Sequence, residues 1–109
     1  MRRAIRPAVR ESDLSRWVRK ALDAANVTYW RVNVTSVRGR KATNIGMSDY
    51  ICVQPGTGRF VGLELKLPGE DLRESQVAFR DEVLAAGGVY IVATSAEEAL
   101  SGIRNGGTP

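Results

Sequence analysis

The sequence predicts an α/β fold, an α+β mixed sheet flanked by helices, with elements in the order α-β-β-β-α-β-α. Three observations predict it. The 109 residues are enough for one domain with a single core but not for two. Apolar residues recur at helical spacing in the longer segments, and they alternate or run together in the shorter ones. Glycine and proline turn signals separate these segments, and no internal repeat or low-complexity linker interrupts them.

The first part of the chain predicts one helix, one strand and one loop. Ser12 or Asp13 can cap a helix that runs to about Ala25. Its apolar stripe comprises Leu14, Trp17, Val18, Ala21, Leu22 and Ala25. Residues 27–34 alternate with the period of a strand, whereas residues 36–47 carry two glycines and three basic residues and predict a loop.

Two further strands are expected over residues 49–53 and 60–67. The sequence between them, Gln54-Pro55-Gly56-Thr57-Gly58, is strong turn chemistry, so the chain should reverse there. The two strands should therefore pair in antiparallel fashion, and Pro68-Gly69 should end the second of them.

The last third of the chain predicts helix, strand and helix. A helix is expected over residues 74–86, ended by Gly87-Gly88. Residues 89–93 are almost wholly apolar, which is typical of a strand buried on both faces. Ser95 and Glu98 match a capping box that opens a last short helix. The domain is thus expected over residues 11–104, between a basic segment at 1–10 and a flexible tail at 105–109.

Composition excludes several kinds of chemistry. The chain contains no histidine, so a Ser-His-Asp triad, a Cys-His pair and a histidine-based nuclease are excluded. Its single cysteine, Cys52, lies in an apolar stretch and is expected to be a small core residue in a reducing, intracellular setting. Any bound metal must be held by oxygen ligands, which favours Mg²⁺ or Mn²⁺ over zinc. No apolar run approaches the roughly 20 residues of a membrane span, and no apolar region typical of a signal peptide follows the basic N-terminus.

The formal net charge of +4 makes a polyanionic partner plausible. One basic cluster crowds the first fifth of the chain: Arg2, Arg3, Arg6, Arg10, Arg16, Arg19 and Lys20. A second consists of Arg38, Arg40 and Lys41. For any one of these residues a solvated surface position is the better interpretation. Two clusters beside a phosphodiester site would nevertheless place some of them on phosphates.

The candidate reaction centre is the pair Glu64-x-Lys66 together with Asp49. Strand alternation places Glu64 and Lys66 on one face, about 7 Å apart along the backbone, and the leucines between and around them on the other. A turn centred near residue 57 puts Asp49 opposite residues 64 to 66, so the two carboxylates can converge on one ion.

Gln76 shares the inward stripe of the following helix with Phe79, Val83 and Ala86. Its side chain is either a structural polar group whose hydrogen bonds are satisfied within the fold or a ligand contact at the mouth of the site. Each of these residues alone has an ordinary structural explanation, a solvated charge pair or a helix cap. Their conjunction favours catalysis.

The chemistry that this set predicts is metal-dependent phosphodiester hydrolysis. Asp49, Glu64 and the backbone carbonyl of Leu65 would bind one or two Mg²⁺ or Mn²⁺ ions. Lys66 would position or help deprotonate the attacking water, or stabilise the phosphorus centre.

The same residues resemble a known family, the virus-type replication-repair nuclease (VRR-NUC) domain of the PD-(D/E)XK superfamily. The resemblance covers about residues 10 to 103 and rests on four segments: Gly46-Met47-Ser48-Asp49, Gly62-Leu63-Glu64-Leu65-Lys66, Leu72 through Gln76 with Phe79, and Gly87-Gly88-Val89-Tyr90. It implies a restriction-endonuclease-like core with Asp49, Glu64 and Lys66 in the catalytic motif and Gln76 as the helix glutamine. Ser48 departs from the proline that is common before the aspartate.

The resemblance also implies a partner and a substrate. It implies Mg²⁺- or Mn²⁺-dependent endonuclease cleavage of branched DNA, such as Holliday junctions or flaps, in DNA repair, by a homodimer. A glutamate on the first helix often completes such a site; Glu11 is the nearest match, with Asp13 as the alternative. Candidate DNA contacts are Arg10, Arg38, Arg40, Lys41 and Arg73. The competing hypotheses are a non-cleaving nucleic-acid-binding module of the same fold and a structural interaction domain.

Overall fold

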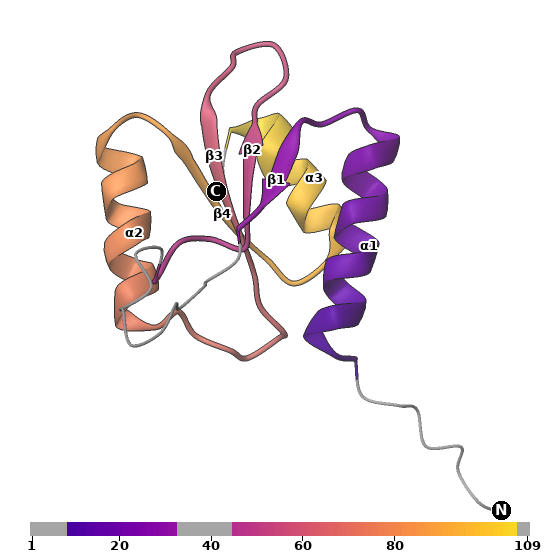
Figure 1. Ribbon diagram of the computed structural model, residues 1–109, viewed down its shortest axis with the longest axis horizontal. Coiled ribbons are helices and arrows are strands. Elements are labelled where there is room, and N and C mark those ends of the chain that lie inside the picture. Colours follow the sequence, from indigo (N-terminus) through magenta and orange to yellow (C-terminus); the bar gives the residue numbers. More distant parts are fainter. Residues whose placement is uncertain (1–8, 33–44, 107–109) are drawn as a thin grey trace, which may run out of the picture.

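The computed structural model describes residues 9–32 and 45–106, and within them the predicted element order is observed (Figure 1). The elements are α1 (Glu11–Ala24), β1 (Tyr29–Arg31), β2 (Tyr50–Val53), β3 (Phe60–Leu65), α2 (Glu74–Ala85), β4 (Val89–Ala93) and α3 (Ala96–Asn105). No helix in these two stretches is long and apolar enough to cross a membrane. The predicted fold class, helices on a four-stranded mixed sheet, is confirmed.

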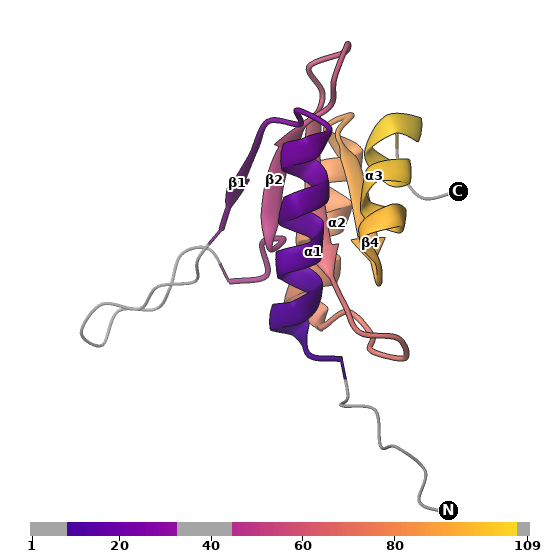
Figure 2. The same cartoon turned by 90° about the vertical axis from the view of Figure 1, so that its right-hand side faces the viewer.

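The sheet has the strand order β1-β2-β3-β4. The first three strands form an antiparallel meander, and β4 runs parallel to β3. The parallel pair needs a crossover, and α2 supplies it between β3 and β4. Figures 1 and 2 show α2 on one face of the sheet and α1 and α3 together on the other.

The main core lies between the sheet and the α1/α3 layer. In β3, Val61, Leu63 and Leu65 turn toward this layer and are at most 5% exposed. Each such side chain contributes about 1.5–3 kcal/mol by leaving water. The neighbouring Cys52 is fully buried, and burial raises the pKa of its thiol to about 12, as expected of a core residue.

Helix α1 begins earlier than its sequence signals indicate. Arg10, not Ser12 or Asp13, occupies the N-cap position, and Asp13 lies in the first turn. The Asp13 carboxylate accepts the backbone N–H of Arg10 at 3.1 Å, which satisfies one of the free donors at the helix start. The predicted apolar stripe is also narrower than expected, because Trp17 is 45% exposed while Leu14 and Val18 are buried.

Other boundaries differ by small amounts. The described part of the first strand is limited to Tyr29–Arg31, β3 ends at Leu65 rather than Leu67, and α2 ends at Ala85. Ala86 is exposed rather than part of a buried stripe. The predicted cap of α3 is confirmed, since Ser95 Oγ accepts the backbone N–H of Glu98 at 3.0 Å. Helix α3 includes Asn105, one residue beyond the predicted domain end. The basic residues at positions 1–8, the loop residues 33–44 and the tail 107–109 lie outside the described residues.

The core assignment gives a stability prediction. Leu63 is fully buried at the centre of β3, so Leu63→Ala should lower the free energy of unfolding by about 2–5 kcal/mol through lost burial and a residual cavity. Leu84 is 51% exposed on α2, and Leu84→Ala should change stability by no more than about 0.5 kcal/mol. Urea denaturation followed by circular dichroism measures both; equal losses in the two variants would contradict the assigned core.

Candidate active site

The two acidic residues of the predicted centre meet at one end of the sheet. The β2–β3 register pairs Tyr50 with Leu63 and Ile51 with Gly62, which carries Asp49 to the level of Glu64. The Asp49 carboxylate accepts the backbone N–H of Leu65 at 2.7 Å, so it is tied to the strand that bears its partner. The structure therefore brings Asp49 next to the strand that carries Glu64, as expected from the turn between β2 and β3.

Glu64 and Lys66 lie on the α2 side of the sheet, opposite the leucine side. Glu64 is 2% exposed and Lys66 is 7% exposed. The backbone N–H of Lys66 donates to the carbonyl of Ala93 at 3.0 Å, so β3 stays anchored to β4 one residue past its formal end. Burial of two ionisable side chains on one face is costly unless each charge has a partner.

Gln76 holds the Glu64 carboxylate in place. Its side-chain oxygen accepts the backbone N–H of Arg73 at 2.8 Å, and its amide nitrogen donates to Glu64 Oε2 at 3.2 Å. The first bond satisfies a free donor at the start of α2, and the second fixes the carboxylate across the layer. The two interpretations open for Gln76 therefore combine: it is a structural group of the helix start and a contact of the site.

The environment raises the pKa of Glu64 to about 8. Burial is the main cause; the hydrogen bond and the charge of Asp49 add to it, and a smaller contribution comes from Glu11. Lys66 acts in the opposite direction and does not offset them. Two carboxylates held this close share a proton near neutral pH, unless a cation supplies the missing positive charge.

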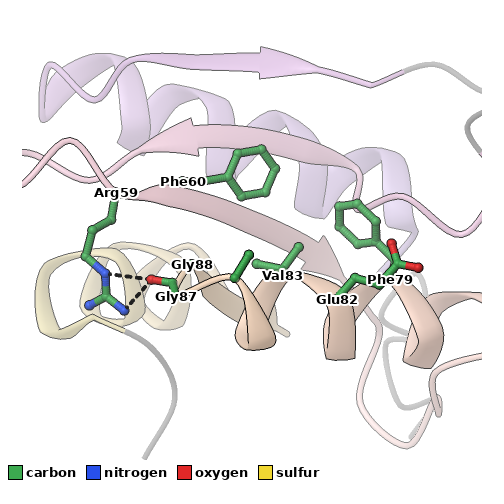
Figure 3. A pocket seen from close by; sticks show the side chains of 8 residues that line it. Arg59, Phe60, Phe79, Glu82, Val83, Gly87 and Gly88 are labelled. Atoms are coloured by element: carbon green, nitrogen blue, oxygen red, sulfur yellow. Dashed lines mark hydrogen bonds between the residues drawn. The ribbon is translucent and has the colours of Figure 1, made fainter.

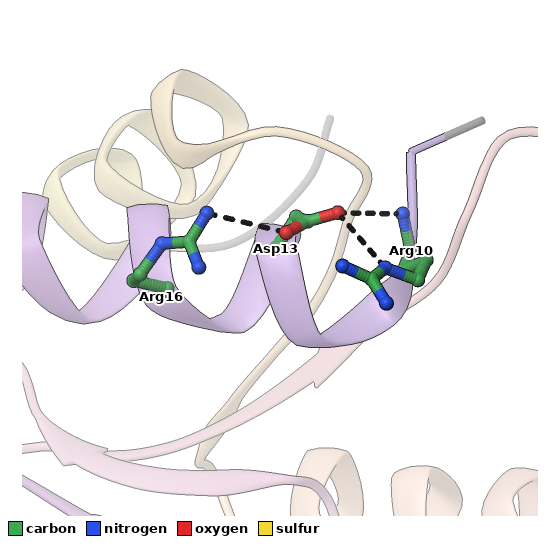
Figure 4. A network of polar contacts seen from close by, with 3 residues as sticks. All are labelled: Arg10, Asp13 and Arg16. Carbon is green, nitrogen blue, oxygen red and sulfur yellow. Dashed lines mark hydrogen bonds and ion pairs between the residues drawn. The ribbon is translucent and has the colours of Figure 1, made fainter. Parts of the chain in front are cut away.

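A cavity of about 240 Å³ opens beside Asp49. It is lined by Glu11, Ser12, Ser15, Arg31, Asp49, Tyr50 and Leu65, which come from α1 and from the first three strands. Glu11 therefore reaches the site region. Asp13 does not line this cavity; its carboxylate bonds to Arg16 at 3.2 Å and to Arg10, as Figure 4 shows, and these contacts lower its pKa.

The donor set fits a hard cation that keeps much of its water. Asp49 and Leu65, whose carbonyl is the third predicted ligand, line the cavity. Glu64 does not line it, but its carboxyl interacts with the Asp49 carboxylate. Among the described residues no three acidic, cysteine or histidine side chains lie close enough together to hold a metal ion, so Glu11 does not complete such a group. Mg²⁺ is commonly held by one or two carboxylates plus waters, and Asp49 and Glu64 supply the two carboxylates of such a set.

A second cavity lies at the other end of β3 and has a different character. It measures about 440 Å³ and is lined by Arg59, Phe60, Phe79, Glu82, Val83, Ala86, Gly87 and Gly88 (Figure 3). The guanidinium of Arg59 donates to the carbonyl of Gly87 from two nitrogens, at 3.2 and 3.0 Å. Its one acid and one base do not form the carboxylate pair predicted from the sequence, so the candidate site is the end of β3 that carries Glu64.

Two residues near the site were not predicted from the sequence. Arg31 lines the Asp49 cavity because the β1–β2 register pairs it with Tyr50. Tyr90 in β4 pairs with Gly62, and its ring lies against that glycine. The alternation of residues 27–34 gave neither the face nor the register of Arg31, since the apolar Trp30 on the opposite face is 58% exposed. Tyr90 belongs to the segment Gly87-Gly88-Val89-Tyr90, but no role in the site was expected for it.

Two of the five predicted DNA contacts, Arg10 and Arg73, lie among the described residues. Arg10 and Arg73 are exposed and cap α1 and α2, so both stand at helix starts near the carboxylate pair. Arg38, Arg40 and Lys41 lie outside the described residues.

Comparison with known proteins supports the fold. A solved structure described as a VRR_NUC domain superposes with a TM-score of 0.62 at 17% sequence identity, covering 86% of this chain and 94% of that chain. No protein-family model matches the sequence, and no curated protein matches it significantly. The chain thus has a restriction-endonuclease-like architecture. More narrowly, it has the fold of a VRR-NUC domain, as the motifs indicated.

The raised Glu64 pKa gives a pH prediction for metal-free protein. The folded state keeps a proton on Glu64 up to about pH 8, whereas the unfolded chain loses it near 4.5. The free energy of unfolding should therefore fall as pH rises from about 4.5 to about 8. Because histidine is absent, few other groups titrate in this window.

Thermal melts in chelator at pH 6 and pH 8 measure this effect. We expect a lower melting temperature at pH 8 for the wild type and a smaller difference for Glu64→Gln. A wild-type melting temperature that does not fall over this range would show that Glu64 is not held protonated.

Proposed function

We propose that the protein is a Mg²⁺- or Mn²⁺-dependent endodeoxyribonuclease that hydrolyses phosphodiester bonds. One observation carries the proposal: Asp49 and Glu64 lie side by side at the end of β3, with the buried Lys66 next along the same face. The VRR_NUC name of the structurally similar protein supports a nuclease, as does the net charge of +4.

Each residue has a defined role in this proposal. Asp49, Glu64 and the Leu65 carbonyl hold the cation, and Gln76 orients Glu64 through its hydrogen bond. A bound Mg²⁺ supplies Lewis acidity toward the phosphate and lowers the pKa of water. Lys66 lies beside the carboxylates and orients the attacking water or compensates charge on the phosphate.

The substrate proposed is branched DNA, such as Holliday junctions or flaps, cut in a DNA-repair setting inside the cell. Exposed Arg10 and Arg73 at the starts of α1 and α2 would meet phosphates near the site. Arg38, Arg40 and Lys41 would add contacts from the loop between β1 and β2.

The second candidate is a DNA-binding module of the same fold that does not cleave. The Glu64 environment argues against it. A buried acid beside a second carboxylate, with its pKa raised to about 8, is a cost that a pure binding surface does not need.

The catalytic proposal predicts that Asp49→Asn and Lys66→Ala each reduce cleavage of branched DNA by about 100-fold or more, since each removes a group that acts on the reacting phosphate. Glu97→Gln removes an exposed acid on α3, on the other face of the sheet, and should leave cleavage unchanged. Purified protein is incubated with junction, flap and linear DNA in Mg²⁺ or in chelator, and the products are resolved on denaturing gels.

Three outcomes of this assay discriminate between the candidate functions. Cleavage that persists in chelator, or in Asp49→Asn, would exclude the proposed centre. Salt-sensitive binding without cleavage by the wild type would favour the binding module. Equal cleavage of linear and branched DNA would remove the proposed selectivity while leaving the nuclease.

A further prediction concerns assembly. One centre cuts one strand, so symmetric cutting of a junction calls for two copies related by a two-fold axis. We expect light scattering after gel filtration to give twice the chain mass of 11.9 kDa at micromolar concentration. A monomer, with or without junction DNA, would contradict paired cutting.

A further inference from the structure

The hydroxyl of Tyr90 lies buried on the same side of the sheet as Glu64 without a hydrogen-bond partner. Tyr90 is 6% exposed, and its hydroxyl oxygen contacts no donor or acceptor among the described residues. A buried polar group without a partner is a net cost to folding. Phenylalanine would fill the same space without that cost, so packing alone does not account for the hydroxyl.

Packing holds the Tyr90 ring firmly in this position. The parallel register sets Tyr90 beside Gly62, and a Cβ built on Gly62 would lie 3.1 Å from the Tyr90 ring. The ring of Phe79 meets it edge to face, with centroids 6.3 Å apart at an angle of 63°. Because the ring is held from two sides, the hydroxyl cannot readily swing out to bulk water to satisfy itself.

The charged groups around Tyr90 keep the hydroxyl protonated. Burial raises its pKa above the ordinary value of a tyrosine, and Glu64 and Asp49 raise it further, against a smaller opposite contribution from Arg80. The hydroxyl is thus a buried hydrogen-bond donor on the face of the sheet that carries Glu64, with no acceptor among the described residues.

We infer that Tyr90 is a positioning residue of the carboxylate site, whose hydroxyl donates to an oxygen ligand held beside Glu64, a water or a phosphate oxygen. This inference rests on the proposed function for its biological meaning. Gln76 already holds Glu64 from α2, and Tyr90 would add a donor from β4, the strand beside β3.

The test compares Tyr90→Phe with Tyr29→Phe. Tyr29 donates to Asp23 at 2.8 Å on the opposite face and lies outside the site, so its variant controls for loss of a tyrosine hydroxyl. In chelator, Tyr90→Phe should melt at or above the wild-type temperature, because it removes an unpaired buried group. Tyr29→Phe should melt at or slightly below it and cleave as the wild type does.

The decisive readouts are the Mg²⁺ response and the kinetics. If the ligand is a water, the Mg²⁺ concentration that half-saturates the rise in melting temperature should increase about 10-fold in Tyr90→Phe, without DNA present. If it is a phosphate oxygen, the Mg²⁺ response should stay at the wild-type value, and kcat/KM on junction DNA should fall by about 10-fold.

The outcomes separate this inference from the proposed function. A wild type that cleaves DNA, with Tyr90→Phe equal to it in Mg²⁺ response and in kcat/KM, overturns the role of Tyr90 and leaves the nuclease intact. A wild type that does not cleave, but whose Mg²⁺ response weakens in Tyr90→Phe, removes the nuclease proposal and supports Tyr90 at a cation site. A clear loss of stability in Tyr90→Phe in chelator would assign the hydroxyl a structural partner and overturn the inference.

Discussion

The close approach of two carboxylates, Asp49 and Glu64, is the constraint to which the rest of the site is adapted. Like charges repel, and burial at the end of β3 makes their coexistence more costly still. This cost favours the protonated form of Glu64, whose pKa is raised to about 8. Such a pair is stable with a shared proton or with a cation, and only the second state is useful for phosphodiester chemistry.

The fold holds this unfavourable pair in place through contacts made elsewhere. On the core side of β3, Leu63 and its neighbours pack against α1 and α3 and contribute the burial energy that fixes the strand. On the other side, Asp49 is tied to the backbone of Leu65, and Gln76 ties Glu64 to the start of α2. Strand alternation places these residues on opposite faces, so the residues that stabilise β3 are not those proposed to act in hydrolysis.

The sequence was informative wherever the determinants are local. The Pro55-Gly56 turn fixed the β2–β3 register, and through it the pairing of Asp49 with Glu64. Positions that depend on distant packing were missed. The early start of α1 at Glu11 is accompanied by the Arg10–Asp13 contact, and Trp17 is exposed although it belongs to the apolar stripe of the helix. Tyr90 reaches Gly62 only because β4 pairs with β3 across a whole helix, which no short-range signal encodes.

Because the two faces of β3 differ in role, a similar fold does not by itself show a similar activity. At 17% identity, a TM-score of 0.62 shows that the two backbones have a similar fold although most residues differ. Many combinations of apolar residues satisfy that requirement, so shared architecture does not transmit an activity. The feature that favours catalysis lies on the other face of β3, where Gly62, Glu64 and Lys66 alternate with the core residues. There an acid and a lysine are buried at a cost that packing does not require, which is typical of functional sites.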